Sequence, residues 1–431
     1  MTLPVIRVPG DKSISHRALL LAALADGESR IGNLQHGEDV RATARALRAL
    51  GCALDETTAT PGDDGVVRVS GMGLRGCRPA ADAIDCGNSG TTARLLLGVL
   101  AAQSITAVLT GDASLRSRPM RRVTEPLAAM GAQFEELGEP DRLPLRVRGG
   151  ALHAITHASP HASAQVKSAL LLAGLAAGVP VRIREPHLSR DHTERMLRAR
   201  GVPVTVQRVG AAHEAAIEPV LRLAALDVTV PGDFSAAAFF IALGALGGGP
   251  GVRVLETGVN PTRTGMLPVL ARMGAHVAIE NERDASGEPV ADLVARPTKL
   301  QATDIAAAEV PALIDEIPIL AVLAARADGT TRIRGAAELR VKETDRIRAL
   351  VHNLRALGVD VDEAEDGMTI TGTQRPLRGK VRTFGDHRIA MAFAVLGATR
   401  NAEIEIDDPG IVAISFPAFW EQLRITREWA A

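Results

Sequence analysis

Cysteine is scarce in this sequence: its 431 residues contain three, Cys52, Cys77 and Cys86. The number is odd and no pair has CxxC spacing, which argues against a disulfide framework and against a thiolate metal cluster. We interpret the three thiols as reduced residues of the core or surface in a cytoplasmic protein.

Net charge and long hydrophobic runs are lacking as well. Lys and Arg number 49 against 50 for Asp and Glu, so no overall field attracts nucleic acid or an anionic membrane, and neither is an expected partner. Every longer apolar run falls well short of ~18 uninterrupted apolar positions, and no charged-then-apolar leader precedes the first strand-like stretch. We expect neither secretion nor membrane insertion, and any anion binding must be local.

Lysine is the rare cation. The chain has five, Lys12, Lys167, Lys299, Lys342 and Lys380, against 44 arginines. Lysine provides a compact point charge with a tunable pKa, which the guanidinium fork does not supply. A lysine that persists in such a chain is therefore a candidate for function.

The sequence does contain a repeat. Five similar phrases end in glycine: LRALG at 47–51, LAAMG at 127–131, LRARG at 197–201, LARMG at 270–274 and LRALG at 354–358. Each closes an amphipathic run and precedes strand-like alternation, so each glycine is predicted to end a helix.

A second phrase, a polar cluster that opens a helix of small apolar residues, occurs six times. Its copies are GDKSISHRALLLAAL, GNSGTTARLLLGVL, SAQVKSALLLAGLAAG, GDFSAAAFFIALGAL, LIDEIPILAVLAA and GDHRIAMAFAVLGA. The two phrases predict six α/β units with two helices each, in two globular domains of three units, with FPAFWEQLRI as the last amphipathic helix. Helix starts carry unsatisfied N–H groups and a positive dipole end, so converging starts would form an anion site.

The segment PGDKSISHR places Lys12 and His16, and Ser13 and Arg17, four residues apart. In a helix they form two adjacent cationic rows on the first turns, where cations oppose the dipole unless an anion is bound. Phosphate binding is the sharper interpretation, and a solvated basic turn is the alternative.

Other segments carry candidate ligands. GNSGTTAR offers glycines for close backbone approach and hydroxyl groups for hydrogen bonds, which fits a phosphate cradle or simply a capped helix. In SLRSRP, Arg118 before Pro119 is the best candidate for a ligand contact. In RVKETDR, Lys342 and Arg346 form a like-charge pair on a predicted helix, which an anion would relieve or which lies on a solvated face.

Asp315 and Glu343 are the carboxylates suited to proton transfer. Histidines at 153, 157 and 161 have helical spacing, but Pro160 and the absence of a cysteine or carboxylate set argue against a metal site, so none is expected.

Taken in this order and spacing, PGDKSISHRALLLAAL, GNSGTTARLLLG, SAQVKSALLLAG, RVKETDRI and GDHRIAMAF closely resemble the EPSP synthase family of 3-phosphoshikimate 1-carboxyvinyltransferases. The resemblance covers essentially the whole chain. GNSGTTAR and RVKETDR are highly specific to the family.

The resemblance implies a two-domain α/β enzyme, three βαβαββ units per domain, with an interdomain active-site cleft that closes on shikimate 3-phosphate. Domain 1 would comprise 1–9 and 232–431 and domain 2 10–231, with crossings near 9–12 and 229–233 and the N-terminal strand packed in the C-terminal half. The implied enzyme is a cytoplasmic monomer that needs no cofactor. It transfers the enolpyruvyl group of phosphoenolpyruvate to the 5-hydroxyl of shikimate 3-phosphate through a tetrahedral intermediate, releasing phosphate, in aromatic amino-acid biosynthesis.

Individual roles follow from the same resemblance. Contacts to shikimate 3-phosphate would come from Lys12, Ser13, Arg17, Ser163, Gln165, Ser189, Asp315, Glu338 and Lys342. Contacts to phosphoenolpyruvate would come from Lys12, Asn88, Gly90, Arg118, Gln165, Arg346 and Arg388. Asp315 would accept the proton of the attacking hydroxyl and Glu343 would protonate the methylene carbon. Lys12 and His387 would assist.

Three positions depart from the pattern of some members. Ala164 stands where some have serine, Glu338 where some have asparagine, and Ile414 where some have a lysine that binds phosphoenolpyruvate. The carboxylate clamp would then rest on Arg346 and Arg388. Gly90 is where alanine excludes the inhibitor glyphosate in family members, so we expect sensitivity here.

Two alternatives stay open at this point. The UDP-N-acetylglucosamine enolpyruvyl transferase shares the fold, but its reactive loop cysteine has no counterpart in GDASLRSRP. A non-catalytic anion-binding protein on the same scaffold is the other, and the carboxylates Asp315 and Glu343 beside the cations argue against it.

Overall fold

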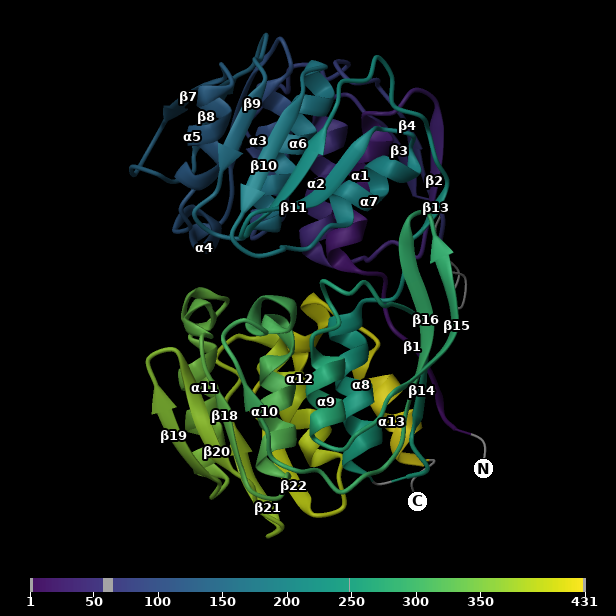
Figure 1. Ribbon diagram of the computed structural model, residues 1–431, viewed down its shortest axis with the longest axis vertical. Coiled ribbons are helices and arrows are strands. Elements are labelled where there is room, and N and C mark those ends of the chain that lie inside the picture. The colour runs from purple at the N-terminus through teal and green to yellow at the C-terminus, as the bar shows by residue number, and fades with distance from the viewer. Residues whose placement is uncertain (1–2, 57–64, 248, 429–431) are drawn as a thin grey trace. The chain divides into compact units, whose positions relative to one another are not determined.

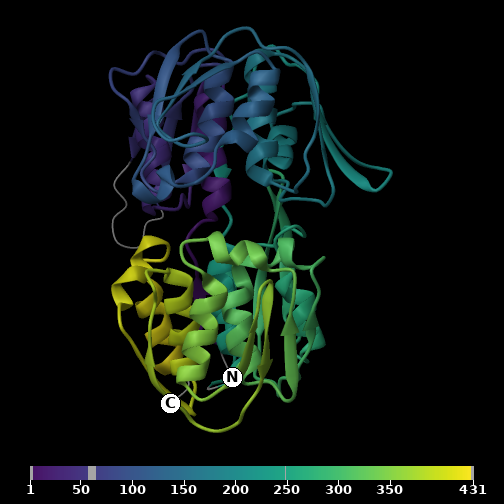
Figure 2. The same cartoon turned by 90° about the vertical axis from the view of Figure 1, so that its left-hand side faces the viewer.

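The computed structural model describes residues 3–56, 65–247 and 249–428. The chain forms two compact units (Figure 1). Unit 1 comprises Met1–Pro9, Gly232–Arg283 and Pro289–Ala431, and unit 2 comprises Gly10–Pro231 and Asp284–Glu288. In each unit, strands lie around a group of helices in both views (Figures 1 and 2).

Asp284–Glu288 belong to unit 2, whereas the boundaries predicted from the sequence place them in domain 1. They form the tip of the hairpin of β15 (Ala278–Ala285) and β16 (Glu288–Ala295). Here His192 Nδ1 lies 2.8 Å from Glu288 Oε1, and Ser286 Oγ donates to the Asp227 carbonyl. The chain therefore passes from one unit to the other at four points instead of the predicted two. The long-range contacts of this tip leave no local signal in the sequence.

The predicted helix pairs are confirmed in all six repeats. The small-residue apolar helices are α1 (Lys12–Ala23), α3 (Gly90–Ala101), α6 (Ala164–Ala177), α8 (Phe234–Leu246), α10 (Ile317–Ala325) and α12 (His387–Gly397). Their partners are α2 (Glu38–Ala49), α5 (Arg121–Ala129), α7 (His192–Ala199), α9 (Met266–Arg272), α11 (Arg346–Ala356) and α13 (Phe419–Glu428). A short helix, α4 (Ala113–Arg116), precedes α5, and 3-10 turns lie at Val310–Ala312, Ile314–Glu316, Ala337–Val341 and Pro409–Ile414.

The strands form one small sheet per repeat, and five sheets have four strands. In unit 2 the spatial orders are β13 (Val228–Thr229), β2 (Glu28–Gly32), β4 (Val67–Ser70), β3 (Ala53–Glu56); β5 (Ile84–Asp85), β6 (Thr106–Thr110), β8 (Leu145–Arg148), β7 (Gln133–Glu136); and β9 (Ile155–Ala158), β10 (Val181–Glu185), β12 (Ala212–Ile217), β11 (Val204–Val209). In unit 1 they are β1 (Val5–Arg7), β14 (Val252–Gly258), β16 (Glu288–Ala295), β15 (Ala278–Ala285); β17 (Asp304–Ile305), β18 (Thr330–Ile333), β20 (Gly367–Thr371), β19 (Asp360–Ala364); and β21 (Leu377–Val381), β22 (Ala402–Ile406).

The first two strands of each sheet are parallel, and an apolar helix connects them wherever they follow one another in the chain. This is the order expected of a crossover connection, because parallel neighbours need a long link while the last two strands are joined by a hairpin. The sixth repeat has its first two strands and both helices within the described residues.

Two first strands are exchanged along the chain. β1 pairs with β14, with Val5 opposite Arg253, which confirms that the N-terminal strand packs in the C-terminal half. β13 takes the corresponding place beside β2 in unit 2, with Val228 opposite Ile31.

The helix-ending role predicted for the repeated glycines is confirmed. Gly51, Gly131, Gly201, Gly274 and Gly358 have φ values of 93°, 115°, 78°, 85° and 80°. This left-handed conformation is strained for other residues, so glycine lets the chain leave the helix and enter the next strand.

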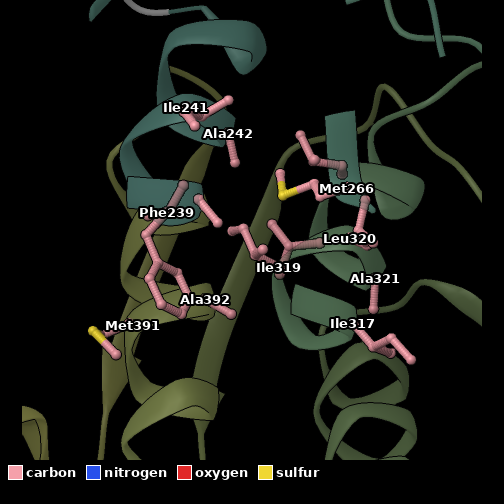
Figure 3. Packing of buried hydrophobic residues seen from close by; sticks show 14 of the residues in the cluster. Phe239, Ile241, Ala242, Met266, Ile317, Ile319, Leu320, Ala321, Met391 and Ala392 are labelled. Atoms are coloured by element: carbon pink, nitrogen blue, oxygen red, sulfur yellow. The ribbon is translucent and has the colours of Figure 1, made fainter. Parts of the chain in front are cut away.

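Each unit has its own apolar core around its small-residue helices. In unit 1, α8, α10 and α12 pack on one another, and Figure 3 shows Phe239 of α8, Leu320 of α10 and Met391 of α12 among the packed side chains. Every residue of α10 is buried. The apolar helices are thus held on all sides, which fixes the positions of their polar starts.

Within the ranges that the structure covers, no helix is long and apolar enough to cross a membrane. Over the same residues, no group of three or more His, Cys, Asp or Glu side chains is arranged to hold a metal ion.

Candidate active site

The three apolar helices of unit 2 begin with polar caps. Asp11, Ser89 and Ser163 cap α1, α3 and α6, and each side chain accepts a hydrogen bond from a backbone N–H of the first turn. One cap satisfies one N–H and leaves the partial positive charge of the remaining first-turn groups. All three starts therefore keep a capacity to attract anions.

Lys12 is the first residue of α1. Its Nζ lies 2.9 Å from Asp39 Oδ2 of α2, and the two side chains are 31% and 27% exposed. A partly exposed ion pair of this kind contributes little to stability. Lys12 can therefore exchange Asp39 for an anionic ligand at small cost.

His16 does not belong to a cationic row, contrary to the prediction. The ring is fully buried in unit 2, with Nδ1 2.7 Å from Thr43 Oγ1, and burial lowers its pKa to about 3. The imidazole is neutral at physiological pH because the interior penalises its charged form. The spacing that suggested two exposed rows could not distinguish the buried face of α1 from the open one.

Arg17 is buried as well, and its guanidinium is fixed by oxygen acceptors. Nε donates to Thr193 Oγ1 at 2.7 Å, Nη2 to Ser168 Oγ at 2.7 Å and Nη1 to the Ser13 carbonyl at 2.8 Å. Burial lowers the pKa of Arg17 to about 10. Arg17 remains a cation at neutral pH and holds the Ser13 carbonyl in the first turn.

Asn88, Gly90 and Arg118 come together at the start of α3. Arg118 Nη2 donates to Asn88 Oδ1. A methyl group on Gly90 would lie 2.8 Å from Arg94 Nη1 and 3.4 Å from Arg118 Nη1. The absence of a side chain at Gly90 thus leaves room for two guanidinium groups.

Arg94 connects this group to Gln165, a link that the sequence reasoning did not identify. Its Nη1 donates to Gln165 Oε1 at 2.7 Å and its Nη2 to the Pro119 carbonyl at 3.1 Å. Gln165 Nε2 in turn donates to Thr91 Oγ1 at 3.0 Å. The signal was the spacing of Arg94 four residues after Gly90, on the same face of the helix.

Ser163 and Ser189 meet at one carboxylate. Glu185, the last residue of β10, accepts from the Ser163 N–H at 2.8 Å and from Ser189 Oγ at 2.7 and 2.9 Å. Ala164, at one of the three departures, is the first residue of α6 beside this group. The structure therefore brings together the serines that the resemblance assigns to shikimate 3-phosphate.

The apolar helices of unit 1 start beside carboxylates and buried arginines. Asp315 lies in the turn before α10, with Oδ1 3.6 Å from Arg346 Nη1 and Oδ2 3.6 Å from Arg263 Nη1. Its backbone carbonyl accepts from Arg388 Nη1 at 3.3 Å. Three guanidinium groups thus contact the residue predicted to accept a proton.

Arg346 is the most enclosed of these cations, with a side chain 1% exposed. Nε donates to Asp386 Oδ2 at 2.7 Å and Nη2 to Glu343 Oε2 at 2.7 Å. Burial lowers the pKa of Arg346, but the attraction of Asp386 and Glu343 outweighs it and the net direction is upward. The Arg346 side chain therefore brings Asp315 and Glu343, the two predicted proton-transfer residues, to a single guanidinium group.

His387 and Arg388 are the first residues of α12, whose cap is Asp386. Asp386 Oδ1 accepts from the Arg388 backbone N–H at 2.8 Å while its other oxygen holds Arg346. The cap thus links the start of α12 to the start of α11. His387 is buried at this junction.

Lys342 and Arg346 do not form the predicted like-charge pair on one helix. Lys342 has extended backbone, and α11 begins only at Arg346 after the cap Asp345. Lys342 Nζ instead lies 3.4 Å from Glu338 Oε1. The cap signal of Asp345 inside RVKETDR outweighs the apparent continuity of the segment.

Glu316 and Arg263 are further charged residues here that sequence reasoning did not select. Glu316 is buried, its Oε1 accepts from Ser235 Oγ, and burial raises its pKa. Arg263 Nη2 donates to Ser235 Oγ at 2.9 Å and to Asp233 Oδ1 at 3.2 Å. LIDEIP displays Glu316 in the sequence, but no local pattern marks Arg263.

Ile414, where some family members have lysine, ends a 3-10 turn and is 50% exposed. An aliphatic side chain there supplies no charge. Arg346 and Arg388 remain as the predicted clamp for a carboxylate.

These residues define a class of enzyme. Unit 2 presents hydroxyl, amide and cationic groups at helix starts, which suits phosphate-bearing substrates, and unit 1 presents carboxylates held by guanidinium groups, which suits proton transfer. The family model for EPSP synthase (3-phosphoshikimate 1-carboxyvinyltransferase) matches residues 4–423. The chain belongs to the EPSP synthase family.

Individual relatives agree with this assignment. The 3-phosphoshikimate 1-carboxyvinyltransferase of Gloeobacter violaceus is 50% identical over 425 residues, 98% of this chain and 96% of the relative. That of Syntrophotalea carbinolica is 47% identical over 423 residues, with the same coverage of 98% and 96%. The solved EPSP synthase of Acinetobacter baumannii is similar with a TM-score of 0.87 at 41% identity, covering 98% of this chain and 96% of that one.

Proposed function

We propose that the protein transfers the enolpyruvyl group of phosphoenolpyruvate to the 5-hydroxyl of shikimate 3-phosphate and releases phosphate, a step of aromatic amino-acid biosynthesis. The family match over residues 4–423 carries this assignment. The chemistry of the site supports it, because two phosphates and two carboxylates need many donors while addition and elimination need proton transfer.

The proposed binding roles are grouped by substrate, and each substrate draws residues from both units. Shikimate 3-phosphate binds Lys12, Ser13, Arg17, Ser163, Gln165, Ser189, Asp315, Glu338 and Lys342. Phosphoenolpyruvate binds Lys12, Asn88, Gly90, Arg118, Gln165, Arg346 and Arg388. Preorganised pairs such as Arg118 with Asn88 and Arg94 with Gln165 support the second set, because donors already fixed in place need little ordering on binding.

In the addition step, the 5-hydroxyl oxygen of shikimate 3-phosphate attacks C2 of phosphoenolpyruvate while Asp315 takes the hydroxyl proton. Glu343 gives a proton to C3, which yields the tetrahedral intermediate. Elimination then removes a proton from the new methyl group, breaks the C–O bond to phosphate and restores the double bond. His387 assists from the start of α12.

Arg346 couples substrate binding to this chemistry. Its Nη2 donates to Glu343 Oε2 at 2.7 Å. The carboxylate of phosphoenolpyruvate would compete for the same nitrogen and release Glu343 from it. Glu343 can then turn to the substrate carbon and donate a proton to it.

Phosphate release from phosphoenolpyruvate tests the proposal. If the protein has this function, phosphate is released with shikimate 3-phosphate but not with UDP-N-acetylglucosamine. We further propose that the protein is a cytoplasmic monomer. Release only with the UDP-sugar would assign the sister enolpyruvyl transferase activity, and release with neither would leave a non-catalytic anion-binding protein. No residue of the site favours those two alternatives.

A further inference from the structure

A buried charge cluster lies next to the predicted shikimate 3-phosphate contacts of unit 2. Lys167 Nζ lies 2.9 Å from Glu194 Oε1 and 3.1 Å from Glu185 Oε2, and it donates to the Ser189 carbonyl at 3.2 Å. The side chains of Lys167, Glu185 and Glu194 are 1%, 3% and 0% exposed. The ammonium group thus donates a hydrogen bond to one carbonyl and lies within ion-pair distance of two carboxylates.

Glu185 joins the cluster to two predicted substrate contacts. Its Oε1 accepts from the Ser163 N–H and from Ser189 Oγ, and its Oε2 also accepts from Ser189 Oγ and lies 3.1 Å from Lys167 Nζ. Ser163 is also the cap of α6. One buried carboxylate therefore sets the position of both serines, and Lys167 is the cation that balances it.

A second layer of the same network holds Arg17. Ser168 and Thr193 accept from its guanidinium and are 2.7 Å from each other. Ser168 directly follows Lys167 on α6, and Thr193 directly precedes Glu194 on α7. Each helix thus gives one residue to each layer, and the network ends at Arg17, Ser163 and Ser189.

Charge balance explains why the ammonium is needed. Burial lowers the pKa of Lys167, but the attraction of Glu194 and Glu185 outweighs it and the net direction is upward, so Lys167 stays charged. Lys167 and Arg17 together offset the two carboxylates. Without Lys167, Glu185 would hold the Ser189 hydrogen more strongly and would repel an incoming phosphate.

The Ser189 hydroxyl has one hydrogen, and it is directed at Glu185. Ser189 can donate to a phosphate oxygen only if the hydroxyl turns away from Glu185. Lys167 keeps a donor on Glu185 when that happens, so the carboxylate is not left without a partner.

We propose that Lys167 is a positioning residue for shikimate 3-phosphate: acting through Glu185, it holds Ser163 in place and allows the Ser189 hydroxyl to turn to the phosphate. The assignment rests on the proposed function. It gives a role to Lys167, one of the five lysines, to which the motif resemblance assigned none.

The test uses the full chain with Lys167→Met and Glu194→Gln together, which removes one charge of each sign and avoids an unpaired Glu194. Titration calorimetry with shikimate 3-phosphate should show a Kd raised about tenfold, the loss expected when charge-assisted hydrogen bonds are misplaced. The KM for phosphoenolpyruvate should stay within about twofold, because its predicted contacts lie outside the network.

Two further variants separate positioning from general destabilisation. Leu171→Ala removes a fully buried side chain from the same helix, and it should lower the melting temperature without changing the Kd. In a Ser189→Ala background, the double substitution should raise the Kd by clearly less than tenfold, because the Ser189 hydroxyl through which Lys167 acts is already absent.

An unchanged Kd in the folded double variant overturns the positioning role, and so does full additivity with Ser189→Ala. Should the double variant fail to fold, Glu185→Gln, which keeps the Lys167 and Glu194 pair, replaces it, and an unchanged Kd there is equally decisive. Wild-type protein that does not bind shikimate 3-phosphate would overturn the proposed function itself.

Discussion

The apolar helices of the two units begin at the same point of the repeat but with different caps. In unit 2, Ser89 and Ser163 cap α3 and α6 and Asp11 caps α1, whereas in unit 1 all three cap positions, those of α8, α10 and α12, are carboxylates: Asp233, Glu316 and Asp386. A serine cap is neutral, so the helix start keeps its attraction for an external anion. In unit 1, the cap carboxylates Asp233 and Asp386 each accept a first-turn N–H and also bind a guanidinium group.

The difference shows how one repeat supports two chemistries. In unit 1, Asp233 and Asp386 hold Arg263 and Arg346, and these arginines contact Asp315. In unit 2, the charged groups next to the helix starts include the partly exposed Lys12, and Arg94 and Arg118 beside the start of α3. Exchange of residues at one structural position thus divides anion binding from proton transfer, and each prediction below probes one side of that division.

Asp315→Asn should have the largest effect, since it removes the predicted base of unit 1 while keeping its shape. A drop in kcat of about 10²–10⁴-fold is expected, with the melting temperature little changed. Asp328→Asn, which alters an exposed partner of Lys299 in the same unit, is the matched control and should be active. A kcat for Asp315→Asn close to wild type would remove Asp315 from the mechanism.

Lys12→Met tests the anion-binding side. The loss of a cation at the start of α1 should lower kcat/KM by about 10²-fold, because a buried substrate phosphate would lack a charged donor. Lys380→Met removes a lysine whose ion pair with Glu405 is exposed, and it should leave turnover unchanged. Equal kinetics in both variants would contradict the role given to Lys12.

Gly90→Ala, a substitution in unit 2, should have a smaller effect on the kinetics. The new methyl group would press on Arg94, which Gln165 and the Pro119 carbonyl hold in place. Overpacking of this kind should raise the KM for phosphoenolpyruvate about tenfold and weaken inhibition by glyphosate. Gly150→Ala, where a methyl group meets nothing within 4 Å, is the control. Wild-type activity that is flat up to millimolar glyphosate would argue against the expected sensitivity.

His16→Gln addresses the stability of unit 2, which buries the neutral imidazole of His16 on the same helix as the charged guanidinium of Arg17. The pKa of His16 is about 3 in the folded protein against 6.5 for the model imidazole. Between these values the unfolded chain binds more protons, so this contribution to stability is complete above pH 6.5 and is lost as the pH falls toward 3. In urea unfolding between pH 7 and 4, the free energy of unfolding should depend less steeply on pH in His16→Gln than in the wild type. The difference in slope should be up to about 1.4 kcal/mol per pH unit. An unchanged slope would show that His16 does not titrate in this way.

The helices and their ends could be predicted because their causes are local. Gly51 and its four counterparts end helices through a conformation that glycine adopts freely, and the sequence displays this directly. The burial of His16 could not be predicted, because it depends on Thr43 from another helix. Lys342 was misplaced because the cap Asp345 lies inside a motif that resembles continuous helix.

Within the site, motif resemblance finds residues that would touch substrate but not those that hold them. Arg94 and Glu185 act on Gln165 and Ser189 through hydrogen bonds between segments far apart in the sequence. Such links have no period and no fixed spacing. They become visible only when the fold brings β10, α3 and α6 together.

The exchange of β1 and β13 has a consequence for synthesis on the ribosome. Unit 2 up to β13 is complete soon after Pro231 emerges, so all of its sheets can close while unit 1 is still being made. β1 is translated long before its neighbour β14, which begins only at Val252. At about 5–20 residues per second, β1 must wait roughly 12–50 s for a partner. The nascent chain therefore carries β1 without its β14 partner while unit 2 is synthesised and can fold.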